Sequence, residues 1–229
     1  QEKSQMIQDM KNGGTIILNG DDDILSGCGP IKGVAPQFFG IGKKNEFYAD
    51  NITSLGLKGT SCTIHLPSGE CFDCTVPLPG AHMVSNALSG AAVGYNLDLT
   101  AGEIKAGIEH LPSIPGRGAI ISTDKLVILD DCYNANPMSM KASLDVLQDG
   151  AGRRIAVLGD MGELGENEVQ LHEEVGEHAG KCDIDVLICT GKLCRNMAER
   201  AQRTNPDLKV IYEPDRESLL EHLKGYVQD

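Results

Sequence analysis

Side chains that could bind a nucleotide are concentrated between Asp130 and Pro137. This run, Asp-Asp-Cys-Tyr-Asn-Ala-Asn-Pro, contains two carboxylates, one tyrosine and two asparagines. An aspartate can accept a hydrogen bond from a ribose hydroxyl, a tyrosine ring can pack on a base, and an asparagine can both donate and accept. The same residue types also form capped loops with Asx turns. On its own, the run therefore favours a binding site and a structural turn equally.

A second polar cluster, Gly159–Gly165, also lies between an expected strand and an expected helix. Its glycines do not match the G-x-G-x-x-G spacing of dinucleotide-binding loops. The G-x-x-x-x-G-K-[ST] motif of phosphate-binding P-loops occurs nowhere in the 229 residues. Taken alone, the cluster is more typical of a flexible connection than of a binding loop.

Three further residues could contact a nucleotide. His82 and Asn86 are four positions apart, so they share one face of an expected helix close to its first turn. A helix N-terminus attracts anions, and asparagine can pair with the amino edge of adenine. Arg117 follows Gly116 at an expected domain boundary, where it could bind a phosphate. A His–Asn pair on a helix is nevertheless more often structural, and an exposed arginine alone is common.

Strands and helices alternate regularly after Gly116. The expected strands span residues 126–129, 155–158, 185–189 and 209–212, and the expected helices span residues 137–147, 166–178, 192–202 and 215–227. Asn136 and Pro137 supply the N-cap and the first residue of the first of these helices. We expect a parallel sheet covered on both faces, with residues 126–129 as a buried strand and ligands at the carboxyl ends of the strands.

The first half of the chain mixes strand and helix signals. Residues 15–19 form a short apolar run that predicts a buried strand. Short alternating runs between residues 34 and 78 predict a small antiparallel section with a hairpin turn at Pro67–Gly69. A helix is expected from His82 to about Tyr95, and Thr100 opens a capping-box signature for a second helix.

The length of 229 residues suits one large domain or two modest ones, and 41% hydrophobic residues allow a core in each. We place a boundary near Ser113–Gly116. The expected fold class is α/β, with a mixed sheet in residues 1–114 and a Rossmann-like parallel sheet in residues 115–229. Helical patterns at both ends lead us to expect that the chain is part of a longer protein.

The net charge excludes some partners. There are 20 basic and 33 acidic residues, which gives a formal charge of −13. An acidic chain repels phosphate backbones, so we do not expect a nucleic-acid partner, although a nucleotide can still be held locally. No signal peptide or long apolar stretch is visible, so no membrane insertion is expected.

The eight cysteines indicate a reducing compartment, because most of them lie in apolar, strand-like segments. We therefore expect reduced thiols and a cytoplasmic location. Cys71 and Cys74 have C-x-x-C spacing, but no second pair follows at the distance of a zinc site. Strand alternation would also place these two side chains on opposite faces, which argues against a shared metal or redox role.

Four segments resemble the Mur ligase family and occur in the family's order. They are Leu78–Leu88, Pro115–Arg117, Asp130–Met140 and Leu158–Gly165. The Tyr-Asn-Ala-Asn-Pro and Gly-Asp-Met-x-Glu-Leu-Gly elements are most similar to the bacterial member that adds D-alanyl-D-alanine to UDP-N-acetylmuramoyl-tripeptide. The resemblance runs from Lys3 to near the end of the chain.

The resemblance implies a part of a three-domain enzyme. Residues 1–114 are similar to the later part of the central ATP-binding domain, without its P-loop, and residues 115–229 to most of the C-terminal ligase domain. The implied activity is ATP-dependent amide formation in peptidoglycan precursor synthesis. The peptide carboxylate would attack the γ-phosphate to give an acyl phosphate, and the D-alanyl-D-alanine amine would displace phosphate, with Mg2+ balancing charge. This chain alone is expected to be inactive.

The resemblance also assigns roles to individual residues. Lys3 matches a carbamylated lysine that helps to hold Mg2+, which makes it a candidate catalytic residue and metal ligand. Asn86 matches an adenine contact, Arg117 a phosphate contact and Asp131 a ribose contact. The remaining residues implied at the nucleotide are Tyr133, Asn134 and Asn136.

Two other readings of the chain stay open. One is a different amide ligase of the same superfamily, such as another Mur ligase or a folylpolyglutamate synthase. The other is a non-catalytic nucleotide-binding module with a Rossmann-like fold. A ligase assay with D-alanyl-D-alanine distinguishes another amide ligase from the expected enzyme. A P-loop encoded upstream of Gln1 would argue against the non-catalytic module.

Overall fold

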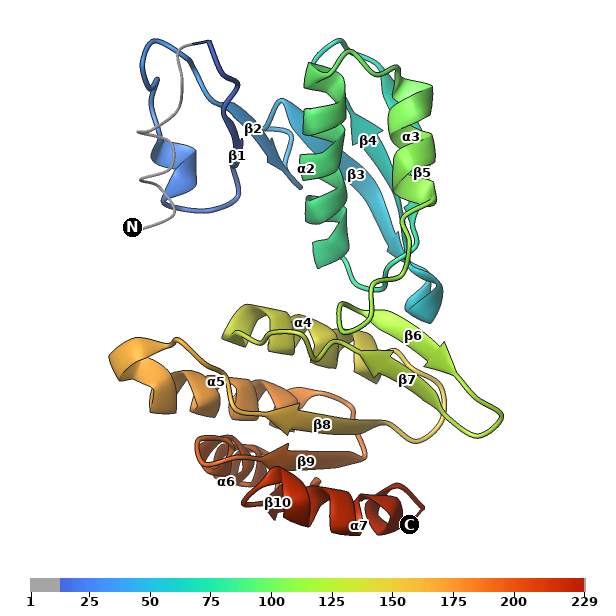
Figure 1. The fold of residues 1–229 in the computed structure, drawn as a ribbon, viewed down its shortest axis with the longest axis vertical. Helices are drawn as coiled ribbons and strands as arrows, with labels where there is room; N and C mark the ends of the chain where they lie inside the picture. Colours follow the sequence, from blue (N-terminus) through green and yellow to red (C-terminus); the bar gives the residue numbers. More distant parts are fainter. Residues whose placement is uncertain (1–12, 229) are drawn as a thin grey trace. The chain divides into compact units, whose positions relative to one another are not determined.

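The computed structural model describes residues 13–228, which fall into two compact units (Figure 1). The boundary in the sequence falls between Pro112 and Ser113, and each unit is described by itself. Lys3 lies outside the described residues.

The first unit is built on a five-stranded mixed sheet. Its strands follow the order β1 (Ile17–Asn19), β2 (Gln37–Gly40), β3 (Phe47–Ser54), β4 (Thr60–His65) and β5 (Cys71–Val76). Strands β1, β2 and β3 are parallel, whereas β4 is antiparallel to both of its neighbours. The prediction of an antiparallel section over residues 34–78 was therefore wrong for β2. Alternating side chains reveal which residues face a core, but they do not encode strand direction.

The turn between β4 and β5 was predicted correctly. The Leu66 N–H donates to the Glu70 carbonyl at 2.9 Å, and Gly69 takes the left-handed conformation with φ of 87°. Glycine adopts that conformation without steric cost, so Gly69 fits the last position of this short loop. Two short 3-10 helices, η1 (Leu25–Gly27) and η2 (Gly56–Lys58), lie in other connections.

Helices α2 (His82–Asn96) and α3 (Ala101–Glu109) cover one face of this sheet (Figure 1). Small side chains at Ala87 and Ala91 let α2 approach the strands closely, where it packs against Phe47 and Ile64. Helix α3 begins at the predicted capping box, in which the Thr100 hydroxyl accepts from the Glu103 N–H.

The second unit contains the predicted parallel sheet. Its strands are β8 (Ile155–Gly159), β9 (Val186–Thr190) and β10 (Lys209–Glu213), in the order β10-β9-β8. The helices are α4 (Pro137–Gln148), α5 (Glu168–Lys181), preceded by η3 (Gly165–Asn167), α6 (Cys194–Thr204) and α7 (Arg216–Gln228).

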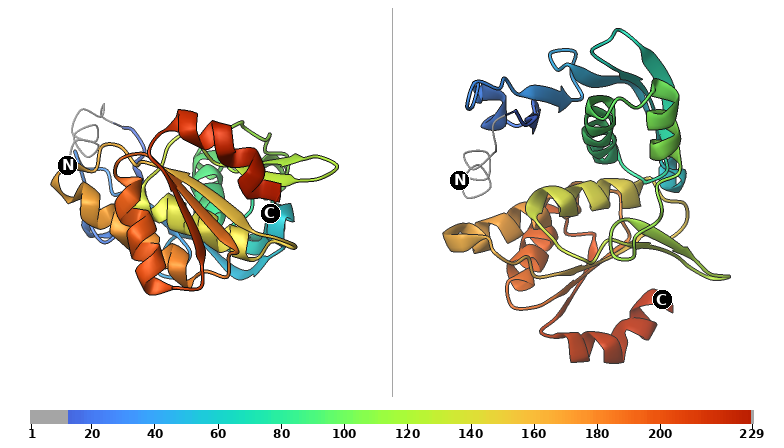
Figure 2. Two further views of the ribbon diagram at one scale, coloured as in Figure 1. Left: turned by 90° about the horizontal axis from the view of Figure 1, so that it is seen from below. Right: turned by 45° about the horizontal axis from the view of Figure 1, so that its top comes forward.

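Side-chain alternation on β9 shows how both faces of this sheet are covered. Leu187 and Cys189 pack with residues of α4, α5 and α6, whereas Val186 and Ile188 pack with Leu219 of α7. Figure 2 shows α7 across the strands from α5 and α6. The prediction of a sheet with helices on both faces is thus confirmed. Among residues 13–228, no helix is both long and apolar enough to cross a membrane.

The strand predicted at residues 126–129 is not a buried member of the parallel sheet. Strand β7 (Val127–Asp130) pairs with β6 (Ala119–Ser122) in an antiparallel hairpin, and Val127 is 57% exposed. The prediction failed because an apolar run indicates a strand without identifying its partner. Strand β6 was missed, although Ala119–Ser122 is itself mostly apolar and a turn at Thr123–Leu126 follows it.

Candidate functional site

The β6–β7 hairpin joins two of the candidate segments in the second unit. Its register pairs Ala119 with Asp130, so the residues before β6 run beside the residues after β7. The Gly116 N–H donates to the Asp130 carboxylate at 2.9 Å, and the Tyr133 N–H donates to the Gly116 carbonyl at 2.9 Å. The Pro115–Arg117 segment and the Asp130–Tyr133 segment are therefore one local structure.

A residue larger than glycine would be strained at position 116. Its φ is 77°, in the left-handed region, and an added Cβ would lie 3.2 Å from the Cβ of Tyr133. Glycine relieves both the backbone strain and the steric contact. The close approach of Gly116 to Tyr133 helps to fix the positions of the two segments that the Tyr133 N–H to Gly116 carbonyl hydrogen bond joins.

Arg117 and Tyr133 form a cation–π pair on the surface of this structure. The guanidinium carbon lies 4.0 Å from the centroid of the Tyr133 ring. Both side chains are exposed, Tyr133 to 68%. Arginine keeps its charge at any physiological pH and can bind phosphate through two parallel N–H groups. The pair therefore presents a fixed cation and an aromatic ring side by side to an incoming ligand.

Asp130 has a structural role in holding this arrangement together. A hydrogen bond from the Cys132 side chain, followed by the bond from the Gly116 N–H, lowers the pKa of Asp130 below its ordinary value. The same carboxylate raises the pKa of the Cys132 thiol. Asp130 therefore acts as an ionised acceptor for the loop, and Cys132 stays protonated near neutral pH.

Asp131 points to helix α4 instead. The Ser143 hydroxyl donates to Asp131 Oδ2 at 2.5 Å, and Asp131 is half-buried. A carboxylate has capacity for further hydrogen bonds beyond this one. Ser143, which sequence reasoning missed, thus holds Asp131 in a position from which it can accept from a hydroxyl group of a ligand.

The two asparagines of the run are used in local structure. Asn136 Oδ1 accepts from the Ser139 N–H at 2.9 Å, and the Ser139 hydroxyl accepts from the Asn136 N–H at 3.1 Å, which completes a capping box at α4. Asn134 Oδ1 accepts from the adjacent Ala135 N–H at 2.9 Å. The predicted N-cap is confirmed, and the amide oxygen of Asn136 is committed to it. A ligand would meet the amide nitrogens of these side chains.

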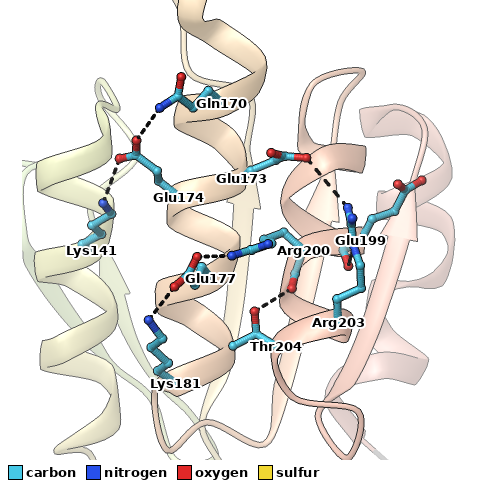
Figure 3. Close-up of polar contacts among 10 residues, drawn as sticks. All are labelled: Lys141, Gln170, Glu173, Glu174, Glu177, Lys181, Glu199, Arg200, Arg203 and Thr204. Carbon is cyan, nitrogen blue, oxygen red and sulfur yellow. Dashed lines mark hydrogen bonds and ion pairs between the residues drawn. The ribbon is translucent and has the colours of Figure 1, made fainter.

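A salt bridge joins α4 to α5 of the same unit (Figure 3). Lys141 Nζ of α4 lies 3.3 Å from the Glu174 carboxylate of α5. Glu177 of α5 accepts hydrogen bonds from both Lys181 and Arg200, the latter on α6. The Lys181 bond and then the Arg200 bond lower the pKa of Glu177 to about 2. The Lys141–Glu174 pair thus links the helix that follows the candidate loop to α5, and the Glu177–Arg200 pair links α5 to α6.

The glycine loop Gly159–Gly165 is an ordered part of the fold. Asp160 Oδ1 accepts from the Cys194 N–H at 2.7 Å, so it caps the start of α6. The Met161 N–H donates to Nε2 of the fully buried His172 at 3.0 Å, and His172 Nδ1 lies 2.7 Å from the Glu168 carbonyl. His172 therefore carries its proton on Nδ1. The sequence-based interpretation of a flexible connection did not foresee these contacts.

In the first unit, Asn86 is exposed on α2. Its Nδ2 lies 3.4 Å from the Met83 sulfur, which is a weak acceptor. His82 is half-buried at the first residue of the helix. The opposite face of α2 is buried through Val84 and Leu88, so Asn86 points away from the core.

Two clusters of side chains have ligand atoms close enough to hold a metal ion. Within residues 13–228 they are Asp145 with His178 and Cys182, and Asp160 with His172 and Cys194. Magnesium prefers oxygen ligands, whereas each cluster contains nitrogen and sulfur. Both nitrogens of His172 are also hydrogen-bonded to the main chain. Neither cluster suits magnesium.

The chain is similar to known proteins over nearly its whole length. The Mur ligase middle domain matches residues 1–94, and the Mur ligase glutamate ligase domain matches residues 116–229. The UDP-N-acetylmuramoyl-tripeptide--D-alanyl-D-alanine ligase of Escherichia coli (strain K12) is 35% identical over 193 residues, which are 83% of this chain and 42% of that protein. The enzyme of the same name from Buchnera aphidicola subsp. Baizongia pistaciae is 33% identical over 98% of this chain and 48% of its own length.

A solved structure agrees with these sequence matches. MurF from Acinetobacter baumannii superposes with a TM-score of 0.83 and 27% identity, over 99% of this chain and 48% of that one. The chain spans about half the length of the relatives that it matches.

Proposed function

The chain belongs to the Mur ligase family, and on that premise we propose that it forms part of an ATP-dependent ligase that joins D-alanyl-D-alanine to UDP-N-acetylmuramoyl-tripeptide. The product is an amide in a peptidoglycan precursor. The support is the sequence shared with relatives named for this reaction and the fold shared with MurF. We assign residues 1–114 to the later part of the central domain and residues 115–229 to the C-terminal ligase domain.

The proposed reaction has two steps. The carboxylate of the tripeptide attacks the γ-phosphate of ATP, which releases ADP and leaves an acyl phosphate. The amine of D-alanyl-D-alanine then attacks the acyl carbon, the C–O bond to phosphate breaks, and the amide forms as phosphate and a proton leave. Such transfers depend mainly on positioning and on stabilising the charge of the transferred group.

Among the contacts in the structure, the Arg117–Tyr133 pair gives the most direct support for a nucleotide-binding position in the second unit. Arg117 is a fixed positive charge that can bind a phosphate of ATP, and the ring beneath it limits the orientations of the guanidinium. Asp131, held by Ser143, is assigned to the ribose hydroxyls. Tyr133, Asn134 and Asn136 are assigned to the same nucleotide, the asparagines through their amide nitrogens.

Two further assignments complete the proposal. Asn86, exposed on α2, is assigned to the adenine. Mg2+ is expected to supply positive charge at the transferred phosphoryl group, with Lys3 in carbamylated form as one of its ligands. Lys3 lies outside the described residues, so no step here depends on its geometry. Most of the eight cysteines lie in apolar, strand-like segments, which supports a cytoplasmic location.

An acceptor panel tests the proposed function. The protein that carries this chain is supplied with ATP and UDP-N-acetylmuramoyl-tripeptide, and ADP release is followed with D-alanyl-D-alanine, D-glutamate, L-alanine or diaminopimelate as the amine. Of the four amines, we expect only the dipeptide to support ADP release. The mass of the product should equal the mass of the tripeptide substrate plus that of the dipeptide, less one water. The absence of ADP release that depends on the dipeptide would reject this assignment.

The 229-residue chain by itself provides the control. It contains no G-x-x-x-x-G-K-[ST] motif, so we expect it to turn over no ATP under the same conditions. Measurable ADP release by the isolated chain would contradict the expectation that ATP turnover requires a P-loop outside these 229 residues.

A further inference from the structure

Two buried cysteines face each other across the β4–β5 hairpin. Cys62 on β4 is directly opposite Cys74 on β5, and their sulfur atoms lie 3.8 Å apart. They are 4% and 5% exposed and belong to the core beneath α2 and α3. The C-x-x-C spacing in the sequence draws attention to Cys71 instead, but Cys71 is exposed on the other face of β5.

The hairpin register suits a covalent link between the two sulfur atoms. Directly opposite residues of an antiparallel pair have Cα atoms about 4.5–5.5 Å apart. Disulfides span Cα separations of roughly 4.4–6.8 Å. The sulfur atoms must approach from 3.8 Å to a bonded distance, which rotation about the Cα–Cβ bonds can supply without a change of register.

We propose that Cys62 and Cys74 are a modification site that forms an intramolecular disulfide on exposure to hydrogen peroxide. One of the two sulfurs attacks a peroxide oxygen as a thiolate, the O–O bond breaks, and the released hydroxide takes up a proton to leave as water. The resulting sulfenic acid is then attacked by the other sulfur, the S–S bond forms, and a second water leaves. In total, two thiols are oxidised and one peroxide is reduced to two waters.

The contact between the two sulfur atoms also favours the first step. Either thiol can donate a hydrogen bond to the other sulfur, so the contact can stabilise a thiolate on one of the two residues. The thiolate is the reactive form of cysteine. A small oxidant suits the site because both sulfurs are buried.

The link would tie the two strands that precede the candidate adenine contact. Strand β5 runs through residues 77–81 into α2, the helix that carries Asn86. A cross-link lowers the conformational entropy of the unfolded hairpin. The oxidised protein is therefore expected to unfold at a higher temperature than the reduced one.

Linkage mapping tests the proposal. The reduced chain is treated with hydrogen peroxide, its remaining thiols are alkylated under denaturing conditions, and its peptides are analysed by mass spectrometry. We expect a peptide pair joined through Cys62 and Cys74 that has lost two hydrogen atoms and separates after treatment with dithiothreitol. Complete alkylation of both residues after peroxide, or a link between Cys71 and Cys74, would overturn the proposal.

Matched variants on the same hairpin separate this site from general oxidation. Cys71→Ser removes the exposed thiol from β5 and should leave the Cys62–Cys74 link and the rise in unfolding temperature unchanged. Cys62→Ala and Cys74→Ala should each abolish the rise. If the folded wild-type protein becomes fully linked but unfolds at the same temperature as before, the stabilising effect is disproved.

Discussion

The guanidinium of Arg117 lies 4.0 Å from the ring centroid of Tyr133, although the two residues belong to segments on opposite sides of a hairpin. The hairpin register and the hydrogen bonds of Gly116 bring them together. A cation–π contact at an exposed site contributes only about 0.5–1 kcal/mol. Its main effect is therefore to orient the arginine, and the contact matters more for binding than for folding.

Replacing Arg117 tests the assignment to phosphate. Arg117→Ala in the protein that carries this chain is expected to raise the KM for ATP about 10-fold or more, because a hydrogen bond to a charged group contributes roughly 1.5–3 kcal/mol. Arg117→Lys should recover part of the loss, since lysine keeps the charge but not the paired N–H groups. Steady-state kinetics with varied ATP measure both effects.

Two comparisons make this test specific. Arg195→Ala removes an exposed arginine that pairs with Glu199 on α6, and the KM for ATP should not change. Tyr133→Leu removes the ring beneath Arg117, so its effect should be smaller in the Arg117→Ala background than in the wild-type protein. Effects that simply multiply would show that the two residues act independently.

Asp131 is predicted to distinguish nucleotides by their ribose hydroxyls. The wild-type enzyme should use ATP better than dideoxy-ATP, which lacks both hydroxyls. Asp131→Ala should remove most of this preference, and Ser143→Ala should reduce it, because the Ser143 hydroxyl holds the carboxylate at 2.5 Å. The ratio of kcat/KM for the two nucleotides is the measurement. An equal loss with both nucleotides would reject the ribose assignment.

Asn136 is predicted to contribute more to stability than its neighbour Asn134. Asn136→Ala removes the acceptor for the Ser139 N–H and should lower the free energy of unfolding by about 1 kcal/mol. Asn136→Asp keeps an acceptor and should lower it less. Asn134→Ala, in the same loop, removes only a bond to the adjacent residue. Denaturant unfolding gives the three values, and a larger loss for Asn134→Ala would contradict the capping role.

The ion pairs of Glu177 with Lys181 and Arg200 predict that the stability of the fold depends on pH. The pKa of Glu177 is lowered to about 2 in the folded protein, below the ordinary value of about 4.3. The carboxylate's contribution is therefore fully present above the ordinary pKa and is lost as the pH falls towards 2. The difference in unfolding temperature between wild type and Glu177→Gln should be larger at about pH 6 than at about pH 3.

A glutamate without these partners serves as the comparison for that experiment. Glu221 is exposed on α7, and Glu221→Gln should show no such trend over the same pH range. The partly exposed position of Glu177 keeps the expected effect modest. A constant difference between wild type and Glu177→Gln at both pH values would show that the two ion pairs do not stabilise the fold.

Local signals explain what the sequence could predict. The cap at Asn136, the capping box at Thr100 and the turn at Gly69 depend on residues a few positions apart, and all three are present. The alternation of strands and helices likewise predicted the parallel sheet, because such connections favour parallel pairing.

Contacts between distant segments explain what the sequence could not predict. The β6–β7 hairpin, the parallel pairing of β2 and the facing pair Cys62–Cys74 all depend on which strands become neighbours and in which register. Asp131 was singled out from the sequence, but its partner Ser143 comes from the next helix. Residue types can propose a site, whereas pairing across the fold decides which side chains hold it in place.

Oxygen transfer gives the most direct test of the proposed ligase reaction. The carboxylate of UDP-N-acetylmuramoyl-tripeptide is labelled with the heavy isotope of oxygen and incubated with ATP, D-alanyl-D-alanine and the protein that carries this chain. An acyl phosphate intermediate passes one labelled oxygen to the released phosphate, so we predict labelled phosphate in amounts equal to the dipeptide-containing product. Unlabelled phosphate, or phosphate release that does not require the dipeptide, would contradict the proposed function.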